Sequence, residues 1–401
     1  MISQAYVFID LPEEKDPVLA GLVATDGSSG RFVYGKHYLQ RGDAIALDPI
    51  NYPLTDTEYR VEGNQGIPTV LLDAGPDNWG RKLMHVLHRQ QPTNKLEELL
   101  ATRGAGVGAL RFSLSRTMPK ERPSFPSLNQ LKAIQDDIAS LIASGELPVE
   151  LERLFEPGSS MGGARPKAVI EDEQSTLWIA KFNRTDDIVD QAKAEQMCYL
   201  MMRDAGIDCC NTRLERIAGR SVILIERFDH YKNVTRRHFI SAHALLYQPK
   251  VKAEEAAFTF SYPRLADIVS KITVNAHIQK QELYRRMVFN VCVGNTDDHL
   301  RNHGFLWVSG ADQYTLAPAY DVVPQPTQIE MHAIGLGSEG RQVSHRNLIS
   351  SHSRFGLSLA QAESCISQVS SVVSEWRSYA ELVELERQDQ AILNKCFKKL
   401  G

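Results

Sequence analysis

Three polar residues late in the chain constrain its fold and chemistry more than any other feature. Asp297 is followed five positions later by Asn302, and a second aspartate, Asp321, stands downstream of two short apolar segments. One carboxylate can orient or deprotonate an attacking hydroxyl, while an amide oxygen and a second carboxylate can hold the magnesium ions that screen ATP phosphates. Protein-kinase catalytic loops have this Asp-x-x-x-x-Asn spacing and place their metal-binding aspartate after a short strand pair. The spacing therefore predicts a kinase.

The residues beside Asp297 leave two assignments open. Asp298 is adjacent to Asp297, so either carboxylate is a candidate base; neighbouring side chains point in different directions, and the spacing to Asn302 favours Asp297. We also assign His299 and Arg301 to the nucleotide site, with His299 better suited to a structural role. The alternative is a turn whose Asn and Asp side chains only cap the backbone.

A Gly/Ser-rich segment, residues 158–167, precedes a predicted strand. Glycines allow backbone N–H groups to approach phosphate oxygens closely. The segment matches neither generic phosphate-loop motif, so a plain surface turn is the alternative; its position ahead of Lys181 and Asp297 favours phosphate binding. The residues predicted to contact the nucleotide here are Ser160, Met161, Gly162, Gly163, Ala164, Arg165 and Lys167.

Lys181 ends a predicted strand, where a lysine can reach the α- and β-phosphates of ATP. Glu195, on the helix predicted next, is the natural partner that would fix this lysine; the alternative is an ordinary strand-end lysine in solvent. Glu226 and Phe228 lie where two lobes would join, so we place them at the adenine, with a simple strand end as the competing interpretation.

The order of predicted elements indicates a two-lobed enzyme. β-branched and aromatic residues predict strands at 5–9 and 31–34 and a pair of strands at 168–170 and 177–181. Residues 214–217 and 221–227 are predicted to form a hairpin around Ala218 and Gly219. Helical spacing then dominates, at 188–205, 240–247, 264–276, 281–294 and 358–398. The predicted class is α+β: a bilobed protein-kinase-like fold, with a small β-rich lobe and a larger helical lobe, preceded by an N-terminal β-rich subdomain.

Three prolines in the segment 118–126 mark the best linker candidate. The predicted domains are an N-terminal subdomain (1–118), a kinase N-lobe with the phosphate loop and hinge (119–228) and a helical C-lobe with the catalytic loop (229–401).

Composition excludes several other classes of protein. The net charge is −4 and the pI is near 6.3, so there is no electrostatic case for direct nucleic-acid or membrane-surface binding. No apolar run is long enough to span a bilayer and no signal peptide is evident, so we expect a cytoplasmic protein. The six cysteines form no C-x-x-C pair, which argues against zinc.

At this point the motifs resemble a known family. The sequence contains G-x-S-x-G-G-A-R-P-K, E-R-F-D, N-T-D-D-H-x-R-N-H-G-F and A-P-x-Y-D-V, beginning at residues 158, 226, 295 and 317. These resemble the HipA-like serine/threonine kinases, the toxins of type II toxin–antitoxin modules. Residues 76–81 and 104–112 resemble the family's N-terminal subdomain, so the resemblance covers nearly the whole chain.

The resemblance implies roles for individual residues. It makes Asp297 the catalytic base, Asn302 and Asp321 the Mg²⁺ ligands, and Lys181 a contact of the ATP phosphates. Ser160 stands where family members autophosphorylate, with Ser159 as the alternative; a phosphate there would add nearly two negative charges beside those of the nucleotide and switch the enzyme off. The resemblance also implies a protein substrate, such as an aminoacyl-tRNA synthetase, and a separate DNA-binding antitoxin.

Two departures leave the substrate open: Asp298 follows Asp297, and the loop reads Gly-Gly-Ala-Arg-Pro-Lys where other members have more polar residues. One alternative is a kinase of a lipid or small molecule. Another is a non-catalytic chain that binds an antitoxin and acts as a corepressor.

Overall fold

A computed structural model of the chain describes residues 2–87, 91–119, 124–144, 165–231, 235–326 and 331–398. It divides into two compact units. Unit 1 comprises Met1–Arg184, Glu226–Pro249 and Leu306–Asp312, and unit 2 comprises Thr185–Ile225, Lys250–Phe305 and Gln313–Gly401. Both units combine helices with strands, which confirms the α+β class. Because the units interleave along the sequence, they divide the chain differently from the three predicted segments, whose boundaries stay predictions.

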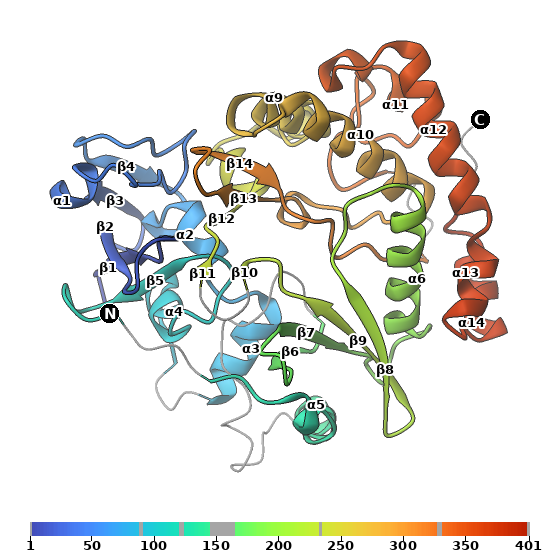
Figure 1. Cartoon of the computed structure of the whole chain (residues 1–401), viewed down its shortest axis with the longest axis horizontal. Helices are drawn as coiled ribbons and strands as arrows, with labels where there is room; N and C mark the ends of the chain where they lie inside the picture. Colours follow the sequence, from blue (N-terminus) through green and yellow to red (C-terminus); the bar gives the residue numbers. More distant parts are fainter. Residues whose placement is uncertain are drawn as a thin grey trace. The chain divides into compact units, whose positions relative to one another are not determined.

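Five antiparallel strands form the N-terminal sheet of unit 1, in the order β4-β3-β2-β1-β5 (Figure 1). The strands are β1 (Gln4–Ile9), β2 (Val18–Thr25), β3 (Ser29–Tyr34), β4 (Tyr59–Glu62) and β5 (Leu110–Ser113). Side chains on one face of a strand alternate with those on the other, and Ala5, Val7 and Ile9 of β1 are all buried in the core. The strands predicted at 5–9 and 31–34 are confirmed.

Short helices and a hairpin complete unit 1. The helices are α1 (Lys36–Leu39), α2 (Thr69–Asp73), α3 (Asn78–Leu87), α4 (Lys95–Ala101), α5 (Leu131–Ser144) and α7 (Ala242–Leu245). Asn94 caps α4 by accepting a hydrogen bond from the Glu97 backbone N–H. β6 (Lys167–Glu171) pairs with β7 (Leu177–Phe182), as predicted, and places Lys167 opposite Lys181. The short strands are β10 (His230–Tyr231), β11 (Thr235–Arg236) and β12 (Phe239–Ser241).

Unit 2 is mainly helical. Its first helix, α6 (Gln191–Asp204), begins at the capping residue Asp190. β8 (Thr212–Ile217) and β9 (Arg220–Glu226) form the predicted hairpin, whose turn places Ala218 and Gly219 at positive φ. The other strands are β13 (Gly304–Val308), which crosses the boundary between the units, and β14 (Gln313–Leu316).

The core of unit 2 is built on α10 (Ala276–Cys292), which packs against α9 (Tyr262–Ile272) and α12 (Leu359–Ser374) (Figure 1). The break between α9 and α10 differs from the predicted one at 277–280. Thr273 leaves the helix in an extended conformation, and Val274 N–H donates to the Tyr314 carbonyl (2.8 Å). Pairing with the strand region therefore ends α9 earlier than helical spacing suggested.

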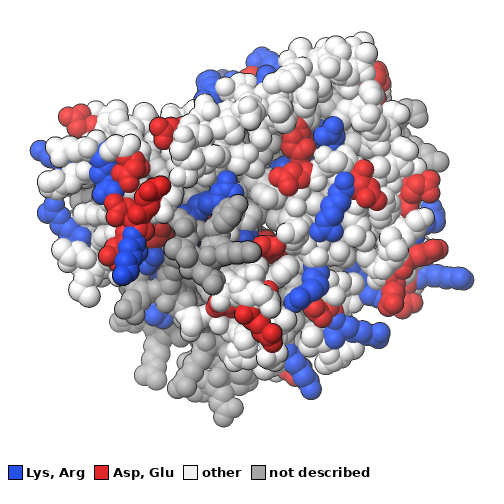
Figure 2. Space-filling model, viewed as in Figure 1, with Lys and Arg blue, Asp and Glu red and all other residues white. Residues whose placement is uncertain are grey.

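The C-terminal helical stretch consists of α12, α13 (Trp376–Leu382) and α14 (Arg387–Leu393); the remaining helices are α8 (Ala253–Thr259) and α11 (His345–Ile349). All six cysteines lie in the described ranges and none forms a disulfide. Among the described helices, none is long and apolar enough to cross a membrane. On the face shown in Figure 2, basic and acidic side chains are interspersed rather than gathered into a field of one sign.

Candidate active site

The predicted catalytic loop, residues 295–302, connects α10 to β13 within unit 2. Its last part is a single 3₁₀ turn, Leu300–Asn302, in which Asn302 N–H donates to the His299 carbonyl (2.8 Å). The Arg301 carbonyl accepts a hydrogen bond from the Tyr320 hydroxyl (2.7 Å), so the loop is tied to the segment that carries Asp321. The structure therefore brings the sequence-distant parts of the predicted site into one region.

Asp297 has an exposed side chain at the start of this loop. The surrounding protein still excludes part of the solvent from its carboxyl group, and this is the largest effect that raises its pKa. His299 lowers the pKa, whereas the negative charges of Asp321 and Asp298 raise it further. The Asp321 effect shows that the two carboxylates lie within electrostatic range of each other. An exposed carboxylate with a raised pKa is a group that can accept a proton from a substrate hydroxyl.

Asn302 presents an acceptor that the described protein does not use. Its side chain is buried, and Nδ2 lies 3.5 Å from the Asp297 carbonyl oxygen. Oδ1 is also buried and has no hydrogen-bond partner among the described residues. A buried polar atom without a partner is costly, and an amide oxygen is a normal ligand of Mg²⁺. The residue therefore fits the predicted metal site.

Asp321 adopts a left-handed backbone conformation, with φ = 60°. Aspartate is among the few residues other than glycine that visit this region, and such positions concentrate at functional sites. Its N–H donates to the Tyr199 hydroxyl at 3.4 Å. Two residues earlier, Ala319 is held by a bridge to Cys209, so the segment leading into Asp321 is fixed on unit 2.

In the described part of the chain, no group of three or more His, Cys, Asp or Glu side chains is arranged to hold a metal. This is compatible with magnesium, because Mg²⁺ is usually bound through one or two carboxylates together with the phosphates of the substrate, without a complete protein cage. Asn302 and Asp321 are the residues here that would supply protein oxygens.

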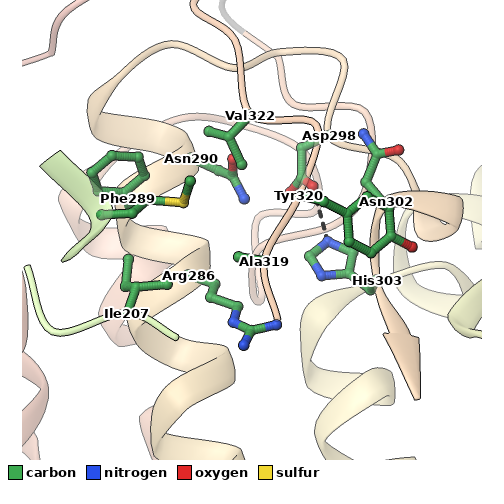
Figure 3. A pocket seen from close by; sticks show the side chains of 11 residues that line it. Ile207, Arg286, Phe289, Asn290, Asp298, Asn302, His303, Ala319, Tyr320 and Val322 are labelled. Atoms are coloured by element: carbon green, nitrogen blue, oxygen red, sulfur yellow. Dashed lines mark hydrogen bonds and ion pairs between the residues drawn. The ribbon is translucent and has the colours of Figure 1, made fainter. Parts of the chain in front are cut away.

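Asp298 is placed quite differently from Asp297. Its side chain is 1% exposed, and Oδ1 accepts a hydrogen bond from His303 Nε2 at 2.9 Å (Figure 3). Oδ2 accepts a second hydrogen bond, from the Tyr262 hydroxyl. Burial favours the neutral acid, but His303, His332 and the Tyr262 hydroxyl outweigh it and lower the pKa of Asp298. A buried carboxylate with both oxygens occupied cannot receive a substrate proton, so the geometry favours Asp297 as the base.

A small cavity lies behind the loop, lined by Arg286, Asn290, Asp298, Asn302 and His303, among others (Figure 3). It offers only about 10 Å³, close to the minimum for one water molecule. It is far too small for a nucleotide and belongs to the support of the loop.

The glycine-rich segment is described only in part. Ser159, Ser160, Met161, Gly162, Gly163 and Ala164 lie outside the described residues, so the predictions on them stay predictions. Lys167 is described and is buried: its ammonium group pairs with Asp77 (2.7 Å), and its carbonyl accepts a hydrogen bond from Trp79 Nε1 (2.9 Å). Any contact of Lys167 with phosphate would be shared with Asp77.

The remaining predicted nucleotide contacts are distributed over both units. Lys181 is buried on β7 in unit 1, whereas Glu195 is buried on α6 in unit 2. Their pairing stays a prediction. His299 has a buried Nδ1 with no hydrogen-bond partner in the described ranges, and Arg301 is exposed.

The E-R-F-D segment contains an ion pair that the sequence analysis missed. Glu226 and Phe228 are half-buried, as adenine contacts would be, but Arg227 and Asp229, which alternate with them, are fully buried. Arg227 forms two hydrogen bonds to the Asp229 carboxylate, Nε–Oδ1 at 3.0 Å and a second nitrogen to Oδ2 at 2.7 Å. Both residues follow the end of β9 at Glu226, and opposite charges two positions apart were the available sequence signal.

Comparisons with known proteins identify the family of this chain. Residues 159–376 match the HipA-like C-terminal domain, and residues 16–113 match the HipA N-terminal domain. The chain belongs to the HipA family. The predicted resemblance is therefore confirmed.

Individual relatives are distant. A HipA serine/threonine-protein kinase toxin of Shewanella oneidensis is 25% identical over 193 residues (42% of this chain, 43% of that protein). A Haemophilus influenzae protein named as a kinase is 27% identical over 183 residues (41% of this chain, 52% of that protein). The chain thus spans about half the length of the curated relatives it matches.

The fold is shared over a much longer stretch. The structure of Shewanella oneidensis MR-1 HipA, solved with HipB and operator DNA, superposes with a TM-score of 0.69 at 16% identity, covering 98% of this chain and 94% of that one. The kinase-like HipA fold predicted from the sequence is therefore confirmed.

Proposed function

We propose that this HipA-family chain is an ATP- and Mg²⁺-dependent serine/threonine protein kinase. The observation that carries the proposal is the arrangement of one loop. The exposed Asp297 carboxylate precedes Asn302, whose Oδ1 has no hydrogen-bond partner among the described residues, and Asp321 lies within electrostatic range of Asp297. Relatives named as kinases support the same activity.

In the proposed reaction, a substrate hydroxyl oxygen attacks the γ-phosphorus of ATP. The bond between that phosphorus and the oxygen of the ADP leaving group breaks, and the hydroxyl proton passes to the Asp297 carboxylate. The raised pKa of Asp297 makes it a stronger base than an ordinary aspartate. When bound through Asn302 and Asp321, Mg²⁺ would neutralise charge on the phosphates.

The other predicted residues position the nucleotide. Lys181, with Glu195, would contact the phosphates, and Glu226 and Phe228 would lie at the adenine. Arg165 and Lys167 belong to the end of the phosphate loop, whose Ser160 (or Ser159) would be autophosphorylated.

The proposal extends to partners. By analogy with the Shewanella structure, which contains HipB and operator DNA, we propose a DNA-binding antitoxin as the partner. An aminoacyl-tRNA synthetase is the proposed class of protein substrate, and a cytoplasmic location fits both.

The test is mass spectrometry of the intact chain and its peptides after incubation with Mg-ATP. Wild type should gain one phosphate on Ser160 or Ser159. Asp297→Asn should gain none, since removing a catalytic base of this kind costs on the order of 10²–10⁴-fold in rate. Glu363→Gln, a change in a partly exposed pair with His345, is the matched control and should behave as wild type.

Other outcomes have definite meanings. The protein could instead bind nucleotide, gain no phosphate, and consume ATP in the presence of a small hydroxylated acceptor. That outcome would replace the proposal with a small-molecule kinase. If the Asp297→Asn chain bound an antitoxin and retained every cellular effect of wild type, the proposed kinase would be replaced by a non-catalytic corepressor.

A further inference from the structure

A chain of hydrogen bonds runs from the first residue of the catalytic loop to Asp298. Asn295 Nδ2 donates to Asn290 Oδ1 (2.9 Å) at the end of α10. Asn290 Nδ2 donates to the Tyr262 hydroxyl (3.1 Å) at the start of α9. The Tyr262 hydroxyl in turn donates to Asp298 Oδ2. Every donor in the chain is directed toward the same carboxylate.

On its other side, Asp298 closes the loop upon itself. Because an ionised carboxylate can only accept hydrogen bonds, His303 Nε2 must be the donor in the 2.9 Å contact with Oδ1. This bond joins residues five positions apart and encloses the segment 299–302. Asp297 directly precedes Asp298 and Asn302 directly precedes His303, so the bond limits how far the two can separate.

The network is shielded from water. Asn290, Asn295, Tyr262, Asp298 and His303 are all buried. Hydrogen bonds in a low-dielectric interior are stronger than those in water, and a fully satisfied buried network rigidifies its surroundings. The ring contact between Tyr262 and His303, with centroids 5.1 Å apart at 74°, fixes the two partners of Asp298 against each other.

We infer that Asp298 is a positioning residue: by holding His303 and Tyr262, its carboxylate sets the distance between the proton acceptor Asp297 and the metal ligand Asn302. The inference rests on the proposed function for the roles of Asp297 and Asn302. It assigns the two adjacent aspartates separate tasks, with Asp297 meeting the substrate and Asp298 maintaining the geometry of the loop.

The test compares two replacements of the donor to Asp298. His303→Leu removes the hydrogen bond, whereas the side-chain amide of His303→Gln can still donate to Asp298. A displacement of about 1 Å in an active site can cost 10²-fold in rate, so His303→Leu should lose kcat on the order of 10²-fold and require more Mg²⁺. The KM for ATP should stay within about twofold, and His303→Gln should recover most of the rate.

The matched control is His345→Leu. His345 and Glu363 form a His–carboxylate contact of the same 2.9 Å length in unit 2, but both side chains are partly exposed. This variant should keep the kcat and Mg²⁺ dependence of wild type. Tyr262→Phe, which removes one hydroxyl with little change of shape, provides a second test if His303→Leu folds poorly; its kcat loss should be smaller and in the same direction.

A second measurement does not depend on turnover. Hydrogen exchange of the Asn302 amide, which donates within the closed segment, should accelerate in His303→Leu and not in His303→Gln or His345→Leu. Wild-type kcat, Mg²⁺ dependence and amide exchange in His303→Leu would overturn the inference. If wild type transferred no phosphate, the proposed function would fail on its own, and unchanged exchange in His303→Leu would still overturn the positioning role.

Discussion

Two of the almost completely buried aspartates, one in each unit, are paired in different ways. In unit 1, Asp229 is 0% exposed and is held by the guanidinium group of Arg227. In unit 2, Asp298 is 1% exposed and is held by a phenol and a histidine. Arg227 is permanently charged, whereas Asp298 is held by one hydroxyl and one imidazole group.

The two aspartates, which have different partners, also hold different parts of the backbone. Asp229 also accepts the Gly108 N–H (2.7 Å), while Arg227 donates to the Ala105 and Gly106 carbonyls. Gly108 sits at φ = 80°, and a Cβ there would lie 2.9 Å from Phe239 Cβ, so glycine is required at this close approach. The Asp229 pair thus clamps backbone that takes no part in the proposed chemistry, and Asp298 orders a loop that does.

Breaking the Asp229 pair should have the largest effect on stability. Arg227→Met leaves a buried carboxylate without its main partner, and such changes cost about 3–5 kcal/mol. Urea unfolding followed by circular dichroism measures the loss in the free energy of unfolding. The control is Arg31→Ala, which removes a pair with Glu58 at 3.8 Å on the exposed surface and should change stability by less than about 1 kcal/mol. An equal loss in both variants would contradict the clamp.

The next effect concerns pH in unit 1. Burial lowers the pKa of His238 to about 4, although its hydrogen bond to the Leu47 carbonyl opposes this. The unfolded chain therefore binds the proton first as pH falls, so the stabilisation is complete above about pH 6.5 and is lost between pH 6.5 and 4, by about 3 kcal/mol. Asp229 adds nothing to this window, because its pKa is lowered well below the usual aspartate range.

His238→Gln tests that assignment. A glutamine amide can donate to the Leu47 carbonyl but does not titrate, so the pH dependence of the unfolding free energy between pH 6.5 and 4 should become flatter by about the same 3 kcal/mol. Unfolding titrations at several pH values provide the measurement. An unchanged slope would place the acid sensitivity elsewhere.

The smallest effect should come from Asp298→Asn. Asparagine keeps the shape of aspartate and can still accept the His303 hydrogen bond. The free energy of unfolding should therefore fall by only about 1–3 kcal/mol, the cost of leaving a buried polar group without a full set of hydrogen bonds. The loss of unfolding free energy should be smaller than for Arg227→Met, measured under the same conditions. A larger loss for Asp298→Asn than for Arg227→Met would show that Asp298 contributes more to stability than the Asp229 pair does.

How far the sequence predicted the structure depends on the range of the interactions. Local patterns were sufficient for β1, β3 and the two predicted hairpins, because alternation and turn residues act over a few positions. The spacing of Asp297, Asn302 and Asp321 is also a local pattern, within one loop and its neighbouring strands; the catalytic roles assigned to these residues stay predictions.

Long-range contacts were not predictable in the same way. Nothing near Tyr262 in the sequence indicates that its hydroxyl meets Asp298, which lies 36 positions later. The early end of α9 depends on the pairing of Thr273 with Tyr314, and the burial of Lys167 depends on Asp77, 90 positions before it. Such contacts arise only once the elements pack, so a single sequence gives no period or spacing from which to infer them.

The contrast between Asp297 and Asp298 also has a genetic consequence. Neighbouring codons should yield distinct classes of inactive mutant. Lesions at codon 297 leave the interior intact, so their products should accumulate normally and still engage binding partners. Lesions at codon 298 disturb a buried network, so their products should be scarcer in the cell and easier to degrade. A screen that scores abundance together with activity would separate the two classes without any structural measurement.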